Sequence, residues 1–346
     1  MKMEVGVLGA TGMVGQQLVR LLENHPWFEL KWVAASDRSA GKSYEEAATW
    51  RMTSLMPDAA RKLRVEECKP GNAPKLVFSA LDATSATTIE PAFAKCGHIV
   101  VSNASAFRMD PEVPLLVPEI NPEHLKIAEK QAARGWKGRI YTNPNCSAVT
   151  LTLALAPLER AFGLKRVAVT TMQAVSGAGY PGVPSMDALG NVIPYIKNEE
   201  EKLEEETQRI LGRFVDGRIE PGAFPVSAHC NRVPVLDGHT QSISVELAKR
   251  VPLEECKKAW SGYRGVPQER KLPSAPPHPV MVMEEVDRPQ PRLDVEREGG
   301  MTVFVGRARA CPVLQYKFTA LGHNTVRGAA GAALLNAELI KSEGLL

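Results

Sequence analysis

The stretch Glu4-Val5-Gly6-Val7-Leu8-Gly9-Ala10-Thr11-Gly12-Met13-Val14-Gly15 joins an apolar strand-like run, a glycine turn and the start of a helix. In such a unit, glycine lets the backbone approach a pyrophosphate, and the helix N-terminus receives its negative charge. The glycines are spaced G-x-x-G-x-x-G, so Thr11 replaces the second glycine of the commoner G-x-G-x-x-G pattern. The sequence therefore predicts nucleotide binding by Gly9, Thr11, Gly12, Met13 and Val14.

The second strand-like run, Glu29 to Ala35, ends in the polar loop Ser36-Asp37-Arg38-Ser39-Ala40-Gly41-Lys42. An NAD site usually places an acid here against the ribose 2′-hydroxyl, and Asp37 could serve. The hydroxyl and guanidinium donors of the loop form a better cradle for a 2′-phosphate. The sequence therefore favours NADP, bound by Ser36, Arg38, Ser39 and Lys42. Taken alone, the loop is also consistent with an exposed polar turn.

Further strand-like runs cover residues 75–79, 98–102 and 139–142, and helical stretches lie between them. This alternation predicts a parallel, doubly wound sheet, in which ligands bind at the carboxyl ends of the strands. Ser79 lies at one such end and is a candidate cofactor contact. The turn after residue 142 lies at another, so we expect one crevice to hold both turns.

The pattern changes from residue 149. An apolar helix, strand-like runs, a charged helix and a hairpin follow in the second half of the chain; they cover residues 149–161, 165–174, 198–211, 228–235, 240–249, 302–310 and 314–319. The proline-rich segment 266–291 reads as a long ordered loop or an arm on a partner subunit. The last helix, 324–340, is expected to return to the first domain. We therefore predict a dinucleotide-binding domain, 1–148, completed by 322–346, and a catalytic and dimerisation domain, 149–321.

Composition narrows the function classes. The chain has 346 residues, 44% hydrophobic and 23% charged, with a net charge of +3. No basic stripe is interleaved with aromatics, so nucleic acid is not an expected partner, and no segment suggests a membrane span. The six cysteines are scattered without a C-x-x-C pair, which argues against disulfides and a metal site. We expect a cytoplasmic enzyme with free thiols.

One cysteine stands at a junction suited to catalysis. The stretch Asn143-Pro144-Asn145-Cys146-Ser147 follows a strand-like run and leads into an apolar helix. A helix N-terminus favours thiolate over thiol, and thiolate is the nucleophile. A buried structural cysteine in a turn is the alternative. Beside a nicotinamide site, such a thiol predicts attack on a carbonyl followed by hydride transfer.

Acid, base and anion-binding candidates are less clearly marked. His239 begins a strand-like run, but His229 and His323 also lie near the ends of elements. Arg108 follows a strand end, and Arg232 lies in a run of valines where a charge needs a reason. The residues alone do not select among them.

Several motifs together resemble the aspartate-semialdehyde dehydrogenase family over essentially the whole chain. They are the glycine turn, the turn around Cys146, Gln173-Ala174-Val175-Ser176-Gly177-Ala178-Gly179, Asn231-Arg232-Val233-Pro234-Val235 with Gly238-His239, Arg288-Pro289-Gln290-Pro291-Arg292-Leu293-Asp294, and Asn324-Thr325-Val326-Arg327-Gly328-Ala329-Ala330-Gly331. The last two segments are similar to the archaeal and fungal branch of that family.

The resemblance implies an α/β fold, with a Rossmann-type domain and an α+β domain built on a mixed sheet. It also implies roles: Cys146 as nucleophile, His239 as acid/base and Gln173 as the residue that orients the substrate. Arg232 matches the ligand of the substrate carboxylate, and Arg108 and Lys202 match phosphate-binding positions. Glu199 matches the acid that pairs with the substrate amine, with Glu200 as a competitor. Asn324 matches a nicotinamide contact.

The activity that the resemblance implies is NADPH-dependent reductive dephosphorylation of L-aspartyl 4-phosphate to L-aspartate 4-semialdehyde, in the lysine, threonine and methionine branch of amino-acid biosynthesis. The alternatives are a malonyl-CoA reductase on the same scaffold, N-acetyl-glutamyl-phosphate reductase, which has a different motif around its cysteine, and a non-catalytic NADP-binding sensor. The expected partners are the small-molecule substrate, phosphate and further copies of the chain, as a homodimer or a homotetramer.

Overall fold

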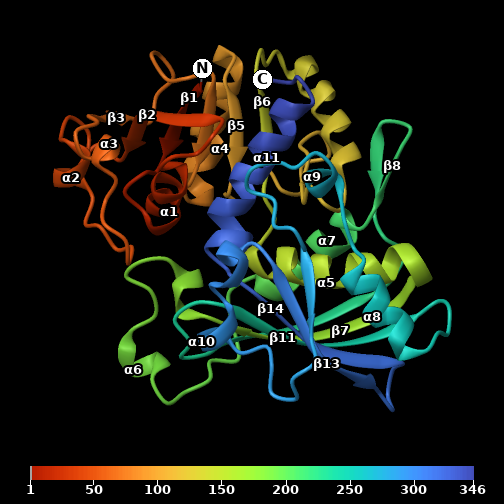
Figure 1. Cartoon of the computed structure of the whole chain (residues 1–346). Coiled ribbons are helices and arrows are strands. Elements are labelled where there is room, and N and C mark those ends of the chain that lie inside the picture. Colours follow the sequence, from red (N-terminus) through yellow and green to blue (C-terminus); the bar gives the residue numbers. More distant parts are fainter. Residues whose placement is uncertain (1) are drawn as a thin grey trace.

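The computed structural model describes residues 2–346, which form two six-stranded sheets with helices packed against them (Figure 1). In Figure 1 the first sheet lies above the second, and both chain ends lie at the top. None of the helices in residues 2–346 combines the length and the apolar character that crossing a bilayer requires.

The first sheet is parallel throughout and has the order β3-β2-β1-β4-β5-β6. Its strands are β1 (Met3–Leu8), β2 (Phe28–Ala35), β3 (Val65–Glu67), β4 (Leu76–Ser79), β5 (Ile99–Ser102) and β6 (Arg139–Thr142). The central strands are buried on both faces, as expected for a sheet covered by helices on each side. The connecting helical segments are α1 (Met13–Leu22), α2 (Tyr44–Ala47), α3 (Asp58–Arg61), α4 (Ala83–Cys96) and the 3₁₀ segment η1 (Pro122–Arg134).

The second sheet is mixed, with the order β10-β7-β11-β14-β13-β12. Its strands are β7 (Leu164–Gln173), β10 (Val226–Arg232), β11 (His239–Leu247), β12 (Val280–Met283), β13 (Val303–Ala310) and β14 (Tyr316–Gly322). β10 and β12 run parallel to their neighbours, and the other pairs are antiparallel. The predicted hairpin of 302–310 and 314–319 is confirmed as β13 and β14.

Helices lie on the face of the second sheet that is turned toward the first domain (Figure 1). They are α5 (Cys146–Phe162), α7 (Glu199–Ile210) and α8 (Leu253–Ser261). α5 is buried along most of its length, in one apolar core with β7, β11 and β13. The remaining short elements are η2 (Val175–Ala178), α6 (Ser185–Ala188), β8 (Arg213–Val215), β9 (Arg218–Glu220), α9 (Val266–Glu269), α10 (Pro291–Asp294) and η3 (Arg297–Gly300).

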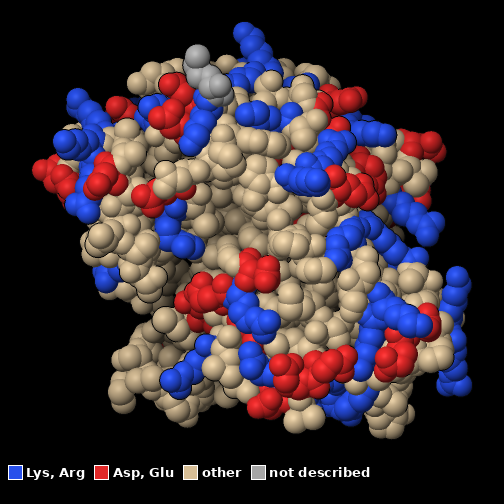
Figure 2. Space-filling view, in the orientation of Figure 1, with Lys and Arg blue, Asp and Glu red and all other residues tan. Residues whose placement is uncertain are grey.

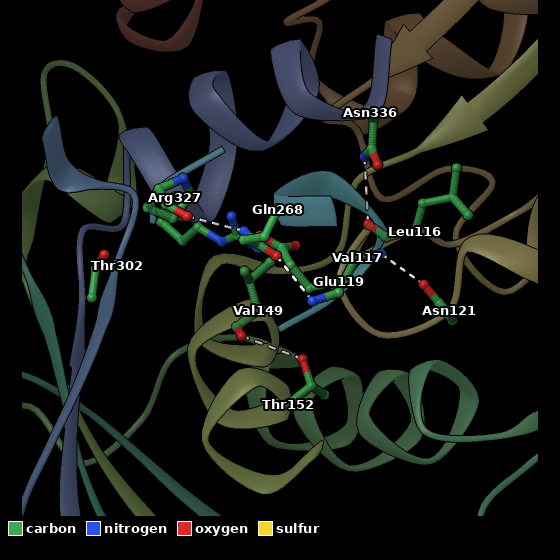
Figure 3. Close-up of polar contacts among 12 residues, drawn as sticks. Leu116, Val117, Glu119, Asn121, Val149, Thr152, Gln268, Thr302, Arg327 and Asn336 are labelled. Atoms are coloured by element: carbon green, nitrogen blue, oxygen red, sulfur yellow. Dashed lines mark hydrogen bonds and ion pairs between the residues drawn. The ribbon is translucent and has the colours of Figure 1, made fainter. Parts of the chain in front are cut away.

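The C-terminal segment returns to the first sheet. It begins with a π-helical turn, η4 (Val326–Ala330), and continues as α11 (Gly331–Ser342), whose side chains belong to the same apolar core as β1 and β2. Arg327, 1% exposed, donates from Nη2 to Glu119 Oε2 at 2.5 Å, and Asn336 Nδ2 donates to the Leu116 carbonyl at 3.4 Å (Figure 3). Buried polar contacts therefore fasten this segment to residues 116–119.

Two segments differ from the prediction. The proline-rich segment 266–291 is not a plain loop or an arm, because it contains α9 and β12, and β12 pairs with β13 of its own chain. The apolar helix begins at Cys146 rather than 149, because Asn145 Oδ1 accepts from the backbone N–H groups of Ser147 and Ala148 and caps the helix.

Candidate active site

Cys146 is the first residue of α5, directly after the turn that leaves β6. The turn is fixed by Asn143, whose Nδ2 donates to Asn103 Oδ1 at 2.9 Å and whose Oδ1 accepts from Asn336 Nδ2 at 2.6 Å. Behind it, a Cβ on Gly328 would come within 2.7 Å of the Cys146 Cβ, so only glycine permits this close approach of η4. The cysteine is half-buried. The fold therefore holds the thiol rigidly at a helix N-terminus.

His239 lies beside the thiol. Its Nε2 is 3.1 Å from Cys146 Sγ, and the side chain is fully buried at the start of β11. The backbone N–H of Ala174 donates to Nδ1 at 3.1 Å. Because Nδ1 accepts this bond, the hydrogen of the neutral ring is assigned to Nε2, which faces the sulfur. Of the three candidate histidines, His239 is the one that contacts Cys146. His229 is exposed on β10, and His323 Nε2 lies 3.4 Å from Glu296 Oε1.

The pKa shifts of Cys146 and His239 run against the thiolate that the helix N-terminus favours. Burial, and next the nearby Glu199 carboxylate, raise the pKa of Cys146 to about 12, against the opposing charges of Arg108 and Arg232. Burial, then the Arg232 charge, lower the pKa of His239 to about 3. Loss of hydration opposes the helix N-terminus here, and its direction favours a neutral thiol beside a neutral imidazole in the free protein.

A cavity of about 750 Å³ opens in front of Cys146 and extends to the glycine turn at the start of α1. Figure 2 shows the surface hollowed between the upper and lower parts of the molecule, with Lys, Arg, Asp and Glu intermixed over the visible face. Ten of the sequence-predicted site residues line this cavity: Gly12, Met13, Val14, Arg108, Cys146, Gln173, Glu199, Lys202, Arg232 and Asn324. The cysteine and the nucleotide turn therefore share one pocket.

The wall near Cys146 is charged. Arg232 is 6% exposed and donates from Nη1 to the Ala174 carbonyl at 2.7 Å. A Cβ on Gly177 would lie 3.0 Å from that Nη1 and 3.2 Å from His239 Nε2, so glycine keeps the space between them open. Gln173, 1% exposed, also faces the cavity from the end of β7. A guanidinium in this setting suits a small carboxylate.

Helix α7 contributes a carboxylate, Glu199, and an ammonium group, Lys202, to the cavity wall. Glu199 Oε1 accepts from Asn145 Nδ2 at 2.9 Å, whereas Glu200 turns away and accepts from the Cys230 N–H at 2.9 Å. Lys202 is half-buried and also lines the cavity. The structure therefore places Glu199, and not Glu200, against the nucleophile turn.

Arg108 projects from the segment after β5 and is 9% exposed. It donates from Nη2 to the Asn103 carbonyl at 2.7 Å, and its buried Nε has no acceptor among the described residues. A buried, unpaired guanidinium N–H beside a cavity suits an anion. Its Nη1 donates to Glu206, a residue that the sequence analysis did not single out, although Glu206 follows Glu199 by two helical turns on the same face of α7.

The nucleotide end has the features that a pyrophosphate requires. Gly9 has φ +72°, and a Cβ on Gly15 would lie 2.2 Å from the Gly9 carbonyl, so both glycines are needed for the turn to pack on its helix. The first turn of α1 carries no acid, and a Cβ on Gly12 would meet only the Gly9 carbonyl, at 3.5 Å. The described residues therefore fit a dinucleotide phosphate at this N-terminus.

Ser79 and the loop after β2, both predicted to contact the cofactor, lie outside the cavity lining. Ser79 is fully buried at the end of β4, and its carbonyl accepts from Asn103 Nδ2 at 3.0 Å. The loop after β2 is mostly exposed, next to the glycine turn, because β2 pairs with β1. Asn324 lines the cavity, but its side chain also bridges the Gly238 N–H and Ser176 Oγ, both at 2.8 Å. Within residues 2–346, no cluster of three or more His, Cys, Asp or Glu side chains is arranged to hold a metal ion.

Comparison with known proteins agrees with this architecture. Residues 4–128 match the family described as "Semialdehyde dehydrogenase, NAD binding domain", and residues 155–327 match "Semialdehyde dehydrogenase, dimerisation domain". The chain is 52% identical to an aspartate-semialdehyde dehydrogenase of Methanothermobacter thermautotrophicus over 97% of this chain and 98% of that protein. It is 44% identical to the enzyme of Saccharomyces cerevisiae, over 99% of this chain and 98% of that one.

A solved structure is also similar. The crystal structure of aspartate-semialdehyde dehydrogenase with NADP from Candida albicans superimposes with a TM-score of 0.93 at 42% identity, covering 100% of both chains. The predicted likeness to archaeal and fungal sequences is confirmed by these relatives. By sequence and by fold, the chain belongs to the aspartate-semialdehyde dehydrogenase family.

Proposed function

We propose that this protein catalyses the reversible, NADPH-dependent reductive dephosphorylation of L-aspartyl 4-phosphate to L-aspartate 4-semialdehyde. The observation that carries the proposal is the position of Cys146 Sγ, 3.1 Å from His239 Nε2 and in one cavity with the N-terminus of α1. An acyl group held on this sulfur lies in the pocket that the nucleotide turn also lines.

In the first step, Cys146 Sγ attacks the acyl carbon. The thiol proton leaves with the phosphate, so this transfer needs no net proton uptake. Arg108 and Lys202 bind the phosphate, and Arg232 binds the α-carboxylate through its fork of N–H donors. The Asn145 side chain occupies the N–H groups of Ser147 and Ala148 but not that of Cys146, which would stabilise the oxyanion by about 3 kcal/mol.

In the second step, the resulting thioester is reduced, and the sulfur becomes the leaving group. NADPH, when bound by the glycine turn, supplies the hydride. His239 passes its Nε2 proton to Sγ as the hemithioacetal collapses and regains a proton from solvent, so the reduction takes up one proton and restores the neutral thiol and imidazole. Gln173 and Glu199 orient the substrate, the latter through its amine. We assign the 2′-phosphate of NADP to Ser36, Arg38, Ser39 and Lys42.

The acid at position 199 favours an amino-acid substrate over malonyl-CoA, which has no amine to pair. One assay separates the candidates: reduction of NADP with aspartate semialdehyde and phosphate, against oxidation of NADPH with malonyl-CoA. We expect turnover only in the first. Turnover with malonyl-CoA alone, or with neither, would contradict the proposal.

We further propose that the protein works as a homodimer or homotetramer, because the matched dimerisation domain covers the second sheet. We assign it to the cytoplasm, because its six cysteines are free thiols. The division at residue 148, with 322–346 returning to the first domain, is proposed on the packing of α11 with β1 and β2. Size-exclusion chromatography with light scattering tests the assembly, and a monomer at assay concentrations would contradict it.

A further inference from the structure

Glu206 is a buried carboxylate beside the active site to which the reaction above gives no role. It lies on α7 and is 1% exposed. Glu199 precedes it by two helical turns and Lys202 by one, on the same face of the helix; those two line the cavity, and Glu206 lies buried one turn beyond them. A buried carboxylate in such a place needs partners that stabilise its charge.

Its two oxygens contact two different parts of the site. Oε1 accepts from Arg108 Nη1 at 3.1 Å, and Oε2 accepts from the backbone N–H of Asn145 at 2.5 Å. Arg108 carries the proposed phosphate-binding guanidinium, and Asn145 caps the helix that begins with Cys146. One rigid carboxylate thus joins the anion-binding side chain to the residue before the nucleophile.

We propose that Glu206 is a positioning residue that holds the Arg108 guanidinium and the Cys146 turn in one fixed relation, so that the acyl phosphate is bound with its carbon at the sulfur. The inference rests on the proposed function, because it takes Arg108 as the phosphate ligand. It differs from a general structural role, since both groups that it joins face the same cavity.

The substitution Glu206→Gln separates positioning from charge balance. Glutamine keeps the shape but offers one acceptor oxygen, so its NH₂ group meets either Arg108 or the Asn145 N–H, both of which are donors. Loss of the negative charge alone would raise the positive potential at Arg108 and tighten anion binding. Loss of positioning would instead weaken anion binding at Arg108.

The experiment measures two quantities in the wild type, E206Q and the control E205Q, which changes the exposed neighbouring glutamate. The first is steady-state NADP reduction at varied phosphate. The second is the rate of Cys146 alkylation by iodoacetamide, followed on its peptide by mass spectrometry, and the phosphate concentration that halves that rate.

For E206Q we expect kcat/KM for phosphate to fall about 10- to 100-fold, the half-protecting phosphate concentration to rise by a similar factor, and the E205Q values to stay at wild type. An unchanged or lower half-protecting concentration in E206Q would overturn the inference. If E206Q does not fold, E206D retains both acceptors one methylene short; a several-fold weaker phosphate protection supports positioning, and wild-type protection contradicts it.

Failure of the proposed function would look different. A wild-type protein without turnover on aspartate semialdehyde, phosphate and NADP would defeat the function. In that case the alkylation measurement still decides the inference, since it needs no turnover. Wild-type Cys146 that phosphate does not protect would overturn the inference as well.

Discussion

The turn around Cys146 lines the active-site cavity, whereas the loop after β2 lies outside its lining and next to the glycine turn. Around Cys146, buried side chains and backbone groups contact one another at fixed distances, including His239 at 3.1 Å and Glu206 at 2.5 Å. Residues 36–42 are mostly exposed and make few such contacts. We therefore expect substitutions around Cys146 to act through geometry, and substitutions in the loop after β2 to act through solvent-screened charge.

The largest effect should follow from removing the sulfur. Cys146→Ala is expected to lower turnover by about 10⁴-fold or more, because no other group takes over covalent capture. NADP binding, measured by fluorescence titration, should persist. Turnover within tenfold of wild type would show that the turn is not the catalytic end.

The next largest effect is a loss of stability on breaking the buried ion pair between Arg327 and Glu119, which holds η4 behind Cys146. Arg327→Met leaves the Glu119 carboxylate, fully buried, without its partner. We expect the free energy of unfolding in urea to fall by about 3–5 kcal/mol. The double variant R327M/E119L should recover most of this loss. A single variant as stable as wild type would contradict the role of the pair.

Glu90 is expected to make the stability of the protein depend on pH. It is fully buried, accepts from Ser102 Oγ at 2.6 Å, and burial raises its pKa from 4.5 to about 7. The native state therefore binds more protons than the unfolded state between these values, so its stability falls as pH rises through that window. Above about pH 7, Glu90→Gln should be more stable than wild type by up to about 3 kcal/mol, and near pH 4.5 it should have no advantage. Urea unfolding of both proteins across this pH range measures the difference in stability. A difference that does not change with pH would contradict the prediction.

Arg232→Lys tests whether carboxylate binding near Cys146 depends on the geometry of the guanidinium or only on its charge. Lysine keeps the charge but loses the fork of donors, so we expect KM for aspartate semialdehyde to rise about 10- to 100-fold with a smaller change in kcat. Steady-state kinetics measures it. An unchanged KM would remove Arg232 from carboxylate binding.

The smallest effect is expected in the exposed loop. Arg38→Ala should lower the ratio of kcat/KM for NADP over NAD by about 5- to 10-fold, and less at high salt, because the lost contact is solvent-screened. Lys249→Ala, an exposed change in the second domain, is the control. A ratio that does not move would place the 2′-phosphate elsewhere.

Much of the fold could be predicted because its signals are local. The run before Gly9, the glycines themselves and the alternation of strands and helices each follow from spacing within a few residues. The order of the mixed sheet could not be read this way, since β12 lies within the proline-rich segment 266–291 and pairs with β13 about 20 residues later in the chain.

The glycine turn and Cys146 were expected from local spacing, and the other expected residues that line the cavity came from the family resemblance; neither source indicated the pKa shifts or the buried supporting contacts. The raised pKa of Cys146 follows from burial, which no spacing in the sequence reveals. Glu206 is one of several glutamates on α7, and the packing of that helix on α5 and β10 decides which of them faces inward. Helical spacing from Glu199 was the one available signal.

The most direct test of this account is a crystal structure with NADP and a substrate analogue bound covalently to Cys146. If acyl capture and hydride transfer share one pocket, the nicotinamide C4 lies within roughly 3–3.5 Å of the carbon attached to Sγ, with the pyrophosphate at the start of α1. A nicotinamide ring outside the cavity that holds Sγ would contradict it.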